Sequence, residues 1–181
     1  GRFNPRDGQL YVSGMKGWVT NAVRDGCLQR VRHTGRPVDL PIAVKTMQNG
    51  IALTFTNPLE PNTAENPDNY AIEQWNYLWS PNYGSPEYRV SAHQVEGRDE
   101  GEVLSATLLP DQRTVFLELP TVKPVMQMGI SYHITSLTGR NLKQTYYHTI
   151  NAVSSQRMDS EQLTRRKKTR LLTLAQRQLL K

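Results

Sequence analysis

The sequence lacks most of the features that mark an enzyme or a metalloprotein. Its 181 residues include one cysteine, Cys27, so neither an intramolecular disulfide nor a cysteine-based zinc or iron–sulfur site can form within it. There is no CxxCH haem-attachment motif, no GxSxG, and no glycine-rich loop opening a helix. No apolar run approaches the roughly 20 residues of a membrane-spanning helix. Acyl-transfer, nucleotide and covalent haem sites therefore have no support in the sequence.

Metal sites have equally little support. None of the four histidines stands in HExxH or HxH spacing: His33, His93, His133 and His148. His133 and His148 fall on two successive expected strands and could be sheet neighbours, but a site would need a third ligand, so we expect surface histidines. A group of four carboxylates lacks the alternating oxygen-ligand spacing of a calcium loop, and we expect a solvated connection there: Glu96, Asp99, Glu100 and Glu102.

The net charge of +6 lies entirely at the C-terminal end. Residues 1–151 hold 14 Lys and Arg against 14 Asp and Glu, whereas residues 152–181 hold eight against two. A pI of 9.6 suggests nucleic acid, yet the balanced body offers no basic face that the sequence identifies. The sequence thus argues against nucleic acid as the partner.

Residues 1–36 predict two short strands, at 9–14 and 26–32, each following an Asp-Gly turn signal. Two such strands cannot bury a core by themselves. We expect them to pack on another body.

Residues 37–151 predict an all-β, Ig-like antiparallel β-sandwich of seven or eight strands, with a small barrel as the alternative. Two hairpins are marked by their turns, one around Asn49-Gly50 and one at 110–113. Strict alternation places Met126, Met128, Ile130, Tyr132 and Ile134 on one face of a strand. Residues 57–69 predict no more than one helical turn, capped by Asn62 with Glu65.

Aromatic residues crowd a strand expected at 70–79. Trp75, Tyr77 and Trp79 would project to one side of it, and Tyr83 follows in a Pro- and Gly-containing loop. Such rings can fill the core or contact a neighbouring domain, and we favour this packing role. The alternative is that they form a platform for sugar rings. All four are candidate ligand or domain-contact residues.

Residues 152–181 predict a basic amphipathic helical or disordered tail, with a helix starting near Ser160. A solvated extension is the simplest interpretation. The alternatives are a nucleic acid or acidic partner and an anionic membrane surface, contacted through Arg165, Arg166, Lys167, Lys168 and Arg170.

Two stretches carry a family resemblance. Residues 1–14, Gly17-Trp18, Arg24-Asp25-Gly26 and 30–35 resemble the closing blade of the β-propeller in bacterial sorbosone- or glucose-dehydrogenase-like proteins. These are the membrane-bound dehydrogenases of planctomycete and verrucomicrobial type, often fused to cytochrome c. The Ig-like module that follows that propeller is similar to residues 50–59, 66–70, 74–77, 110–118, 124–128 and 147–151. Cys27 departs from the pattern, where a small residue is expected, and the basic tail is outside it.

The resemblance implies three parts: a propeller-closing segment at 1–36, a sandwich at 37–151 and the tail at 152–181. The parent protein would be secreted or periplasmic and would use a quinone or pass electrons to haem. No catalytic, cofactor-binding or metal-binding residue of that family maps onto this chain, so we expect no cofactor and no activity in it alone. It would brace the missing propeller blades or space them from an electron-transfer domain; the alternative is a carbohydrate-binding module that takes polysaccharide on the aromatic platform.

Overall fold

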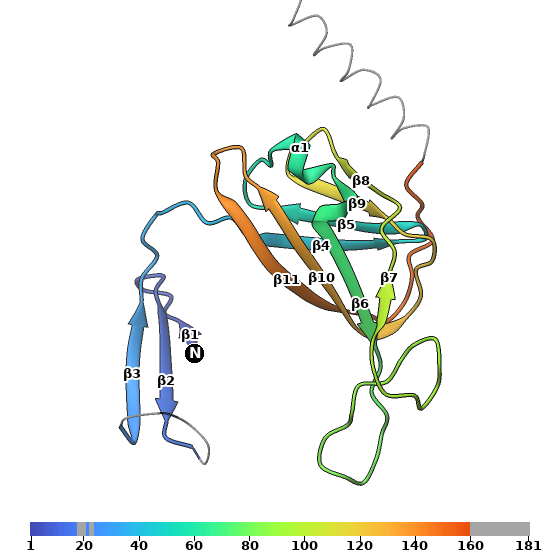
Figure 1. Ribbon diagram of the computed structural model, residues 1–181. Helices are drawn as coiled ribbons and strands as arrows, with labels where there is room; N and C mark the ends of the chain where they lie inside the picture. Colours follow the sequence, from blue (N-terminus) through green and yellow to red (C-terminus); the bar gives the residue numbers. More distant parts are fainter. Residues whose placement is uncertain (18–20, 22–23, 160–181) are drawn as a thin grey trace, which may run out of the picture. The chain divides into compact units, whose positions relative to one another are not determined.

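The computed structural model describes residues 1–17, 21 and 24–159. They form two compact units, Gly1–Val38 and a second that begins at Asp39. Antiparallel sheets make up both units, so the predicted all-β class is confirmed (Figure 1). The expected tail helix lies outside the described residues. No helix among the residues described is both long and apolar enough to span a membrane.

The first unit is a three-stranded antiparallel sheet. Its strands are β1 (Arg2–Phe3), β2 (Leu10–Met15) and β3 (Gly26–Val31), in the order β1-β2-β3. The two predicted strands are therefore present, and β1 adds a third. A turn at Asp7-Gly8 joins β1 to β2: Gly8 has a φ of 66°, and the Asp7 carboxylate accepts a hydrogen bond from the Gln9 amide at 3.0 Å.

The second unit is an antiparallel sandwich of two four-stranded sheets, not a closed barrel (Figure 1). One sheet has the order β11-β10-β6-β7 and the other β4-β5-β9-β8. The strands are β4 (Pro41–Met47), β5 (Gly50–Phe55), β6 (Tyr70–Trp75), β7 (Asp99–Gly101), β8 (Ser105–Leu108), β9 (Thr114–Glu118), β10 (Val125–Thr135) and β11 (Asn141–Ile150).

Apolar side chains from the inner faces of the two sheets fill the space between them. Phe55 of β5 meets Tyr132 of β10 edge to face, with ring centroids 5.3 Å apart. The largest fully buried members of this core are Ile51, Leu53, Phe55, Leu59, Val115, Leu117, Met128, Ile130 and Ile134. The period-2 alternation of these strands therefore places one apolar face of each sheet inside.

Both predicted hairpins are confirmed. Gln48 and Asn49 form the two-residue connection between β4 and β5, and Gly50 already pairs with Met47. At the second hairpin, partial burial raises the pKa of the Asp111 carboxyl, but hydrogen bonds from Thr114 and Arg113 outweigh it and leave that pKa below its usual value. Asp111 thus holds the turn in its ionised form.

Two local predictions are wrong in detail. Met126 does not share the core face of Met128, because the register shifts between Val125 and Met128, turning Val125 inward and leaving Met126 49% exposed. The single helical turn, α1 (Pro61–Ala64), is present, but its cap is Glu60, whose carboxylate accepts from the amides of Asn62 and Thr63. A 3₁₀ turn, η1 (Pro67–Asn69), follows it.

The outer face of the sheet β4-β5-β9-β8 carries a small second cluster. Phe116, fully buried, packs there with Ala52 and Met47, and Met158 from the segment after β11 lies against them. Asn49 fixes this segment, because its side-chain amide donates to the Met158 carbonyl at 3.0 Å and accepts from the Met158 amide at 2.9 Å. Hydrogen bonds from the β4–β5 turn therefore hold the segment around Met158 against the sandwich.

Candidate aromatic loop site

The candidate site is the long connection between β6 and β7, residues 76–98, which we call the aromatic loop. It lies at the end of the sandwich opposite α1 (Figure 1). The predicted strand at 70–79 is wrong beyond Trp75, where β6 ends. Asn76 pairs with Tyr88 instead, by two backbone hydrogen bonds of 2.8 and 2.9 Å, and so begins a separate turn. Trp75, Tyr77 and Trp79 therefore do not line one face of a continuous strand.

Trp75 is packed against the protein and cannot receive a ligand. Its side chain is 4% exposed and lies on the outer face of the sheet, opposite to the core residue Ile72. Tyr147 meets it edge to face at 6.2 Å, lying over Gly129, where a Cβ would be 3.0 Å from the tyrosine ring. The Trp75 indole N–H donates to the Tyr77 hydroxyl at 2.9 Å. Trp75 is therefore buried, but beneath the loop and not in the core between the sheets or against another domain, where the favoured prediction placed it.

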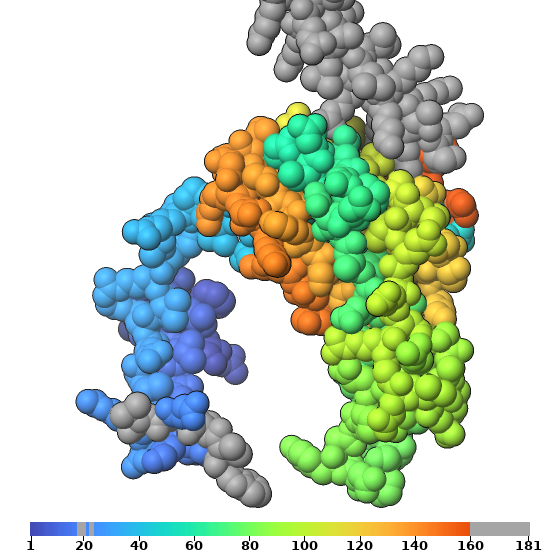
Figure 2. All heavy atoms as spheres, viewed as in Figure 1, coloured from blue at the N-terminus to red at the C-terminus, as the bar shows by residue number. Residues whose placement is uncertain are grey.

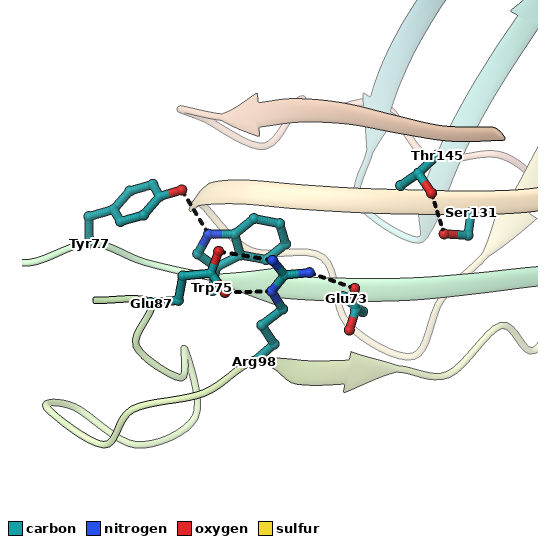
Figure 3. A network of polar contacts seen from close by, with 7 residues as sticks. All are labelled: Glu73, Trp75, Tyr77, Glu87, Arg98, Ser131 and Thr145. Atoms are coloured by element: carbon teal, nitrogen blue, oxygen red, sulfur yellow. Dashed lines mark hydrogen bonds and ion pairs between the residues drawn. The ribbon is translucent and has the colours of Figure 1, made fainter. Parts of the chain in front are cut away.

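Arg98 covers the indole ring of Trp75 on the side facing the loop (Figure 3). Its guanidinium lies 4.0 Å from the centroid of the indole ring. The same group forms a two-point contact with the Glu87 carboxylate, at 2.6 and 2.9 Å, and a third hydrogen bond of 2.9 Å to Glu73. The hydrogen bond from Arg98 lowers the pKa of Glu87 and that from Glu87 raises the pKa of Arg98, so both stay charged at neutral pH.

These contacts fix the base of the aromatic loop. The Gly97 amide donates to the Glu87 carbonyl at 2.8 Å, and the Leu78 amide donates to the Ser85 hydroxyl at 3.0 Å. These hydrogen bonds hold the outgoing and returning segments of the loop together at its base. The far part of the loop projects beyond the sandwich as a lobe, green in Figure 2. Hydrogen bonds and ion pairs to the sheet thus fix the base of the loop, whereas the aromatic side chains of its tip are exposed.

The tip carries two fully exposed aromatic residues. Trp79 has a relative exposure of 101% and Tyr83 of 109%, whereas Tyr77 is at 36%. Fully burying a large apolar side chain contributes about 1.5–3 kcal/mol of free energy. Burial of these two exposed rings against a ligand or partner would therefore favour binding. Of the four predicted aromatic candidates, the structure thus leaves Trp79 and Tyr83 accessible to a ligand or partner.

A pocket of about 380 Å³ lies at the root of the loop. Its wall is mostly apolar and includes Tyr77, Leu78, Tyr88, Val125 and Met126, with Arg89 as its charged member. The outward turn of Met126, caused by the register shift in β10, contributes one side of it. This side chain could not be placed there from sequence alternation alone.

The histidine and carboxylate predictions have mixed outcomes. His133 and His148 are not sheet neighbours, since His133 pairs with Lys143 and His148 with Met128. His148 is half-buried and not fully on the surface: neither of its ring nitrogens is accessible, and burial lowers its pKa. Asp99 and Glu100 belong to β7, not to a loop. No cluster of three metal-ligating side chains occurs in the described part of the chain.

Arg98, Glu87 and Glu73 were missed at the sequence level. No local spacing signals them, because their pairing requires the loop to fold back over β6. The predicted basic candidates Arg165, Arg166, Lys167, Lys168 and Arg170 lie outside the described residues.

Comparisons with family models, with curated proteins and with solved structures found no match to this chain.

Proposed function

We propose that the chain is a non-catalytic docking module whose N-terminal sheet is completed by a partner. One observation carries this proposal: none of the described side chains of residues 1–38 is buried, although they form a three-stranded sheet. Phe3 is 74% exposed, Leu28 75% and Met15 77%. A sheet of this size is stable only when an apolar face is covered, so it needs a covering surface beyond its own strands.

The resemblance to dehydrogenase-like proteins supplies the partner in this proposal. The sheet would close the β-propeller of such a protein, and the sandwich, Ig-like in that family, would brace the propeller or space it from an electron-transfer domain. Any quinone or haem would belong to other parts of that protein, and its compartment would be the periplasm or the exterior. The predominance of strand is compatible with this assignment, whereas Cys27 departs from the family pattern.

Hydrogen exchange of the chain by itself tests the dependence on a partner. We expect the amides of β2 and β3 to exchange at least about 100-fold faster than those of β5 and β9, since an uncovered sheet opens at low cost whereas core strands open only with the whole unit. The internal comparison needs no second protein. Equal protection of β2 and β5 would contradict the proposal.

The exposed tip of the aromatic loop favours a second candidate function, binding of polysaccharide. Sugar rings present C–H faces that stack on aromatic rings, and Trp79 and Tyr83 are both fully exposed. The braced base of the loop, held by Arg98 and Glu87, lowers the ordering cost of binding. The platform would then consist of two rings at the tip, without Trp75.

Calorimetric titration with soluble xylan and with hydroxyethyl cellulose tests this candidate. We expect saturable binding that Trp79→Ala and Tyr83→Ala each weaken about tenfold, which corresponds to about 1.4 kcal/mol per ring. Leu104→Ala, at another exposed apolar side chain, serves as the matched control and should bind as the unchanged chain does. Absence of binding, or an equal effect of all three substitutions, would remove the carbohydrate function.

A further inference from the structure

The balanced charge of residues 1–151 conceals two stretches of opposite sign. Residues 1–38 contain seven Lys and Arg against two Asp, a net charge of +5, whereas residues 39–151 contain seven against twelve, a net charge of −5. All seven basic side chains of the first unit are exposed. Among the described residues, no carboxylate lies within ion-pair distance of any of them. The boundary at Val38 therefore separates a net positive charge that the total for residues 1–151 conceals.

The register of the small sheet sorts its side chains onto two faces. Arg2, Tyr11 and Arg30 lie directly opposite one another on adjacent strands and so share one face. The Asp7 carboxylate, near this row, accepts from the Tyr11 hydroxyl at 2.8 Å and from the Gln9 amide. The other face carries Phe3, Leu10, Val12, Cys27 and Val31 together with the polar Gln29, whereas Met15 and Leu28 share the face of Arg30.

The outer edge of β3 is open. β3 is the last strand in the order β1-β2-β3, and every residue from Gly26 to Val31 is exposed. An edge of this length presents unpaired main-chain N–H and C=O groups that another strand can satisfy. Neither a lipid surface nor a nucleic acid offers a main-chain ladder of this kind.

We infer that the β3 edge accepts a strand from an acidic protein partner, with a carboxylate beside Arg30 and apolar side chains on the Val31 face. This inference rests on the proposed docking function and specifies the chemistry of its partner. An added antiparallel strand of alternating Glu and Val meets both requirements, because its period of two matches that of β3. The positive unit charge would also speed the encounter with such a partner.

A designed peptide tests the inference on the full chain. The probe is a fluorescent, end-capped Glu-Val-Glu-Val-Glu-Val peptide, and the measurement is fluorescence anisotropy at low and moderate salt. We expect it to bind at least about tenfold tighter than the Lys-Val counterpart and to weaken as salt rises. A Glu-Val-Glu-Pro-Glu-Val peptide should lose most of this affinity, because proline removes a main-chain donor and disfavours the strand.

Charge reversal in the protein locates the contact. Arg30→Glu should weaken binding about fivefold or more, whereas Lys45→Glu, the same change on the edge strand β4 of the sandwich, should leave it unchanged. Loss of binding in Lys45→Glu alone would place the peptide on β4 and overturn the inference. So would equal binding of the Glu and Lys peptides, or binding of single-stranded DNA or phosphatidylserine vesicles without binding of the Glu-Val peptide.

Failure here is distinguishable from failure of the docking function itself. If β2 and β3 exchange rapidly in the chain alone but the Glu-Val peptide shows no preference, the sheet still needs a partner and the acidic assignment is wrong. If β2 and β3 are already as protected as β5, the docking function fails regardless of the peptide result.

Discussion

Replacing Gly50 by alanine should destabilise the sandwich by about 3 kcal/mol. A Cβ at this position would lie 2.2 Å from the Leu117 carbonyl oxygen and 2.5 Å from the Phe116 ring. The carbonyl belongs to the central strand β9, so neither neighbour can yield without moving the pairing of β5 with β9 or the buried ring. A domain of this kind has a total stability of about 5–15 kcal/mol, so the loss is a large share of it.

Urea unfolding followed by far-UV circular dichroism measures this loss. Gly26→Ala is the matched control, since a Cβ there would have its nearest neighbour, the Gly14 carbonyl oxygen, at an ordinary 3.6 Å. We expect that control to leave the unfolding transition of the sandwich in place. A change below about 1 kcal/mol for Gly50→Ala would show that β5 and β9 adjust freely, and would contradict the close approach.

Trp75→Ala should cost about 3–5 kcal/mol of stability, whereas Trp79→Ala and Tyr83→Ala should each stay within about 0.5 kcal/mol. The first substitution empties the space beneath Arg98 and beside Tyr147, and the indole is 4% exposed. The other two remove rings that touch almost nothing in the protein. The pattern separates a structural aromatic residue from two that are available for binding.

Denaturant titration monitored by circular dichroism suits this series, because it does not depend on the tryptophans that are removed. Trp75→Phe is the conservative control: it keeps a ring under the Arg98 guanidinium but loses the hydrogen bond to Tyr77, so an intermediate loss is expected. Equal stability of Trp75→Ala and Trp79→Ala would mean that the loop does not cover Trp75 in solution.

Much of the fold follows from local pattern. The hairpins around Gln48-Asn49 and Asp111 were predictable because turn chemistry lies within a few consecutive residues. The alternation in β10 predicted its core face correctly from Met128 to Ile134. It failed at Met126, since the register shift there is imposed by pairing with β11 and is not a property of β10 alone.

The candidate site was predictable only as a concentration of aromatic residues. Strand periodicity treats Trp75, Tyr77 and Trp79 alike, yet one is buried, one is partly covered and one is fully exposed. The difference arises because the chain turns at Asn76 and returns through Tyr88, a pairing between residues twelve positions apart. Glu87 and Arg98 meet for the same reason.

By itself, the sequence determined that this protein is built of short antiparallel strands with a polar outside and an apolar inside, because that information is carried by periods of two and by turn residues. The tertiary structure decided which aromatic residues are covered, and it revealed that a neutral stretch of chain divides into a basic sheet and an acidic sandwich. Cover and unit boundaries depend on contacts between distant residues, which no local pattern encodes.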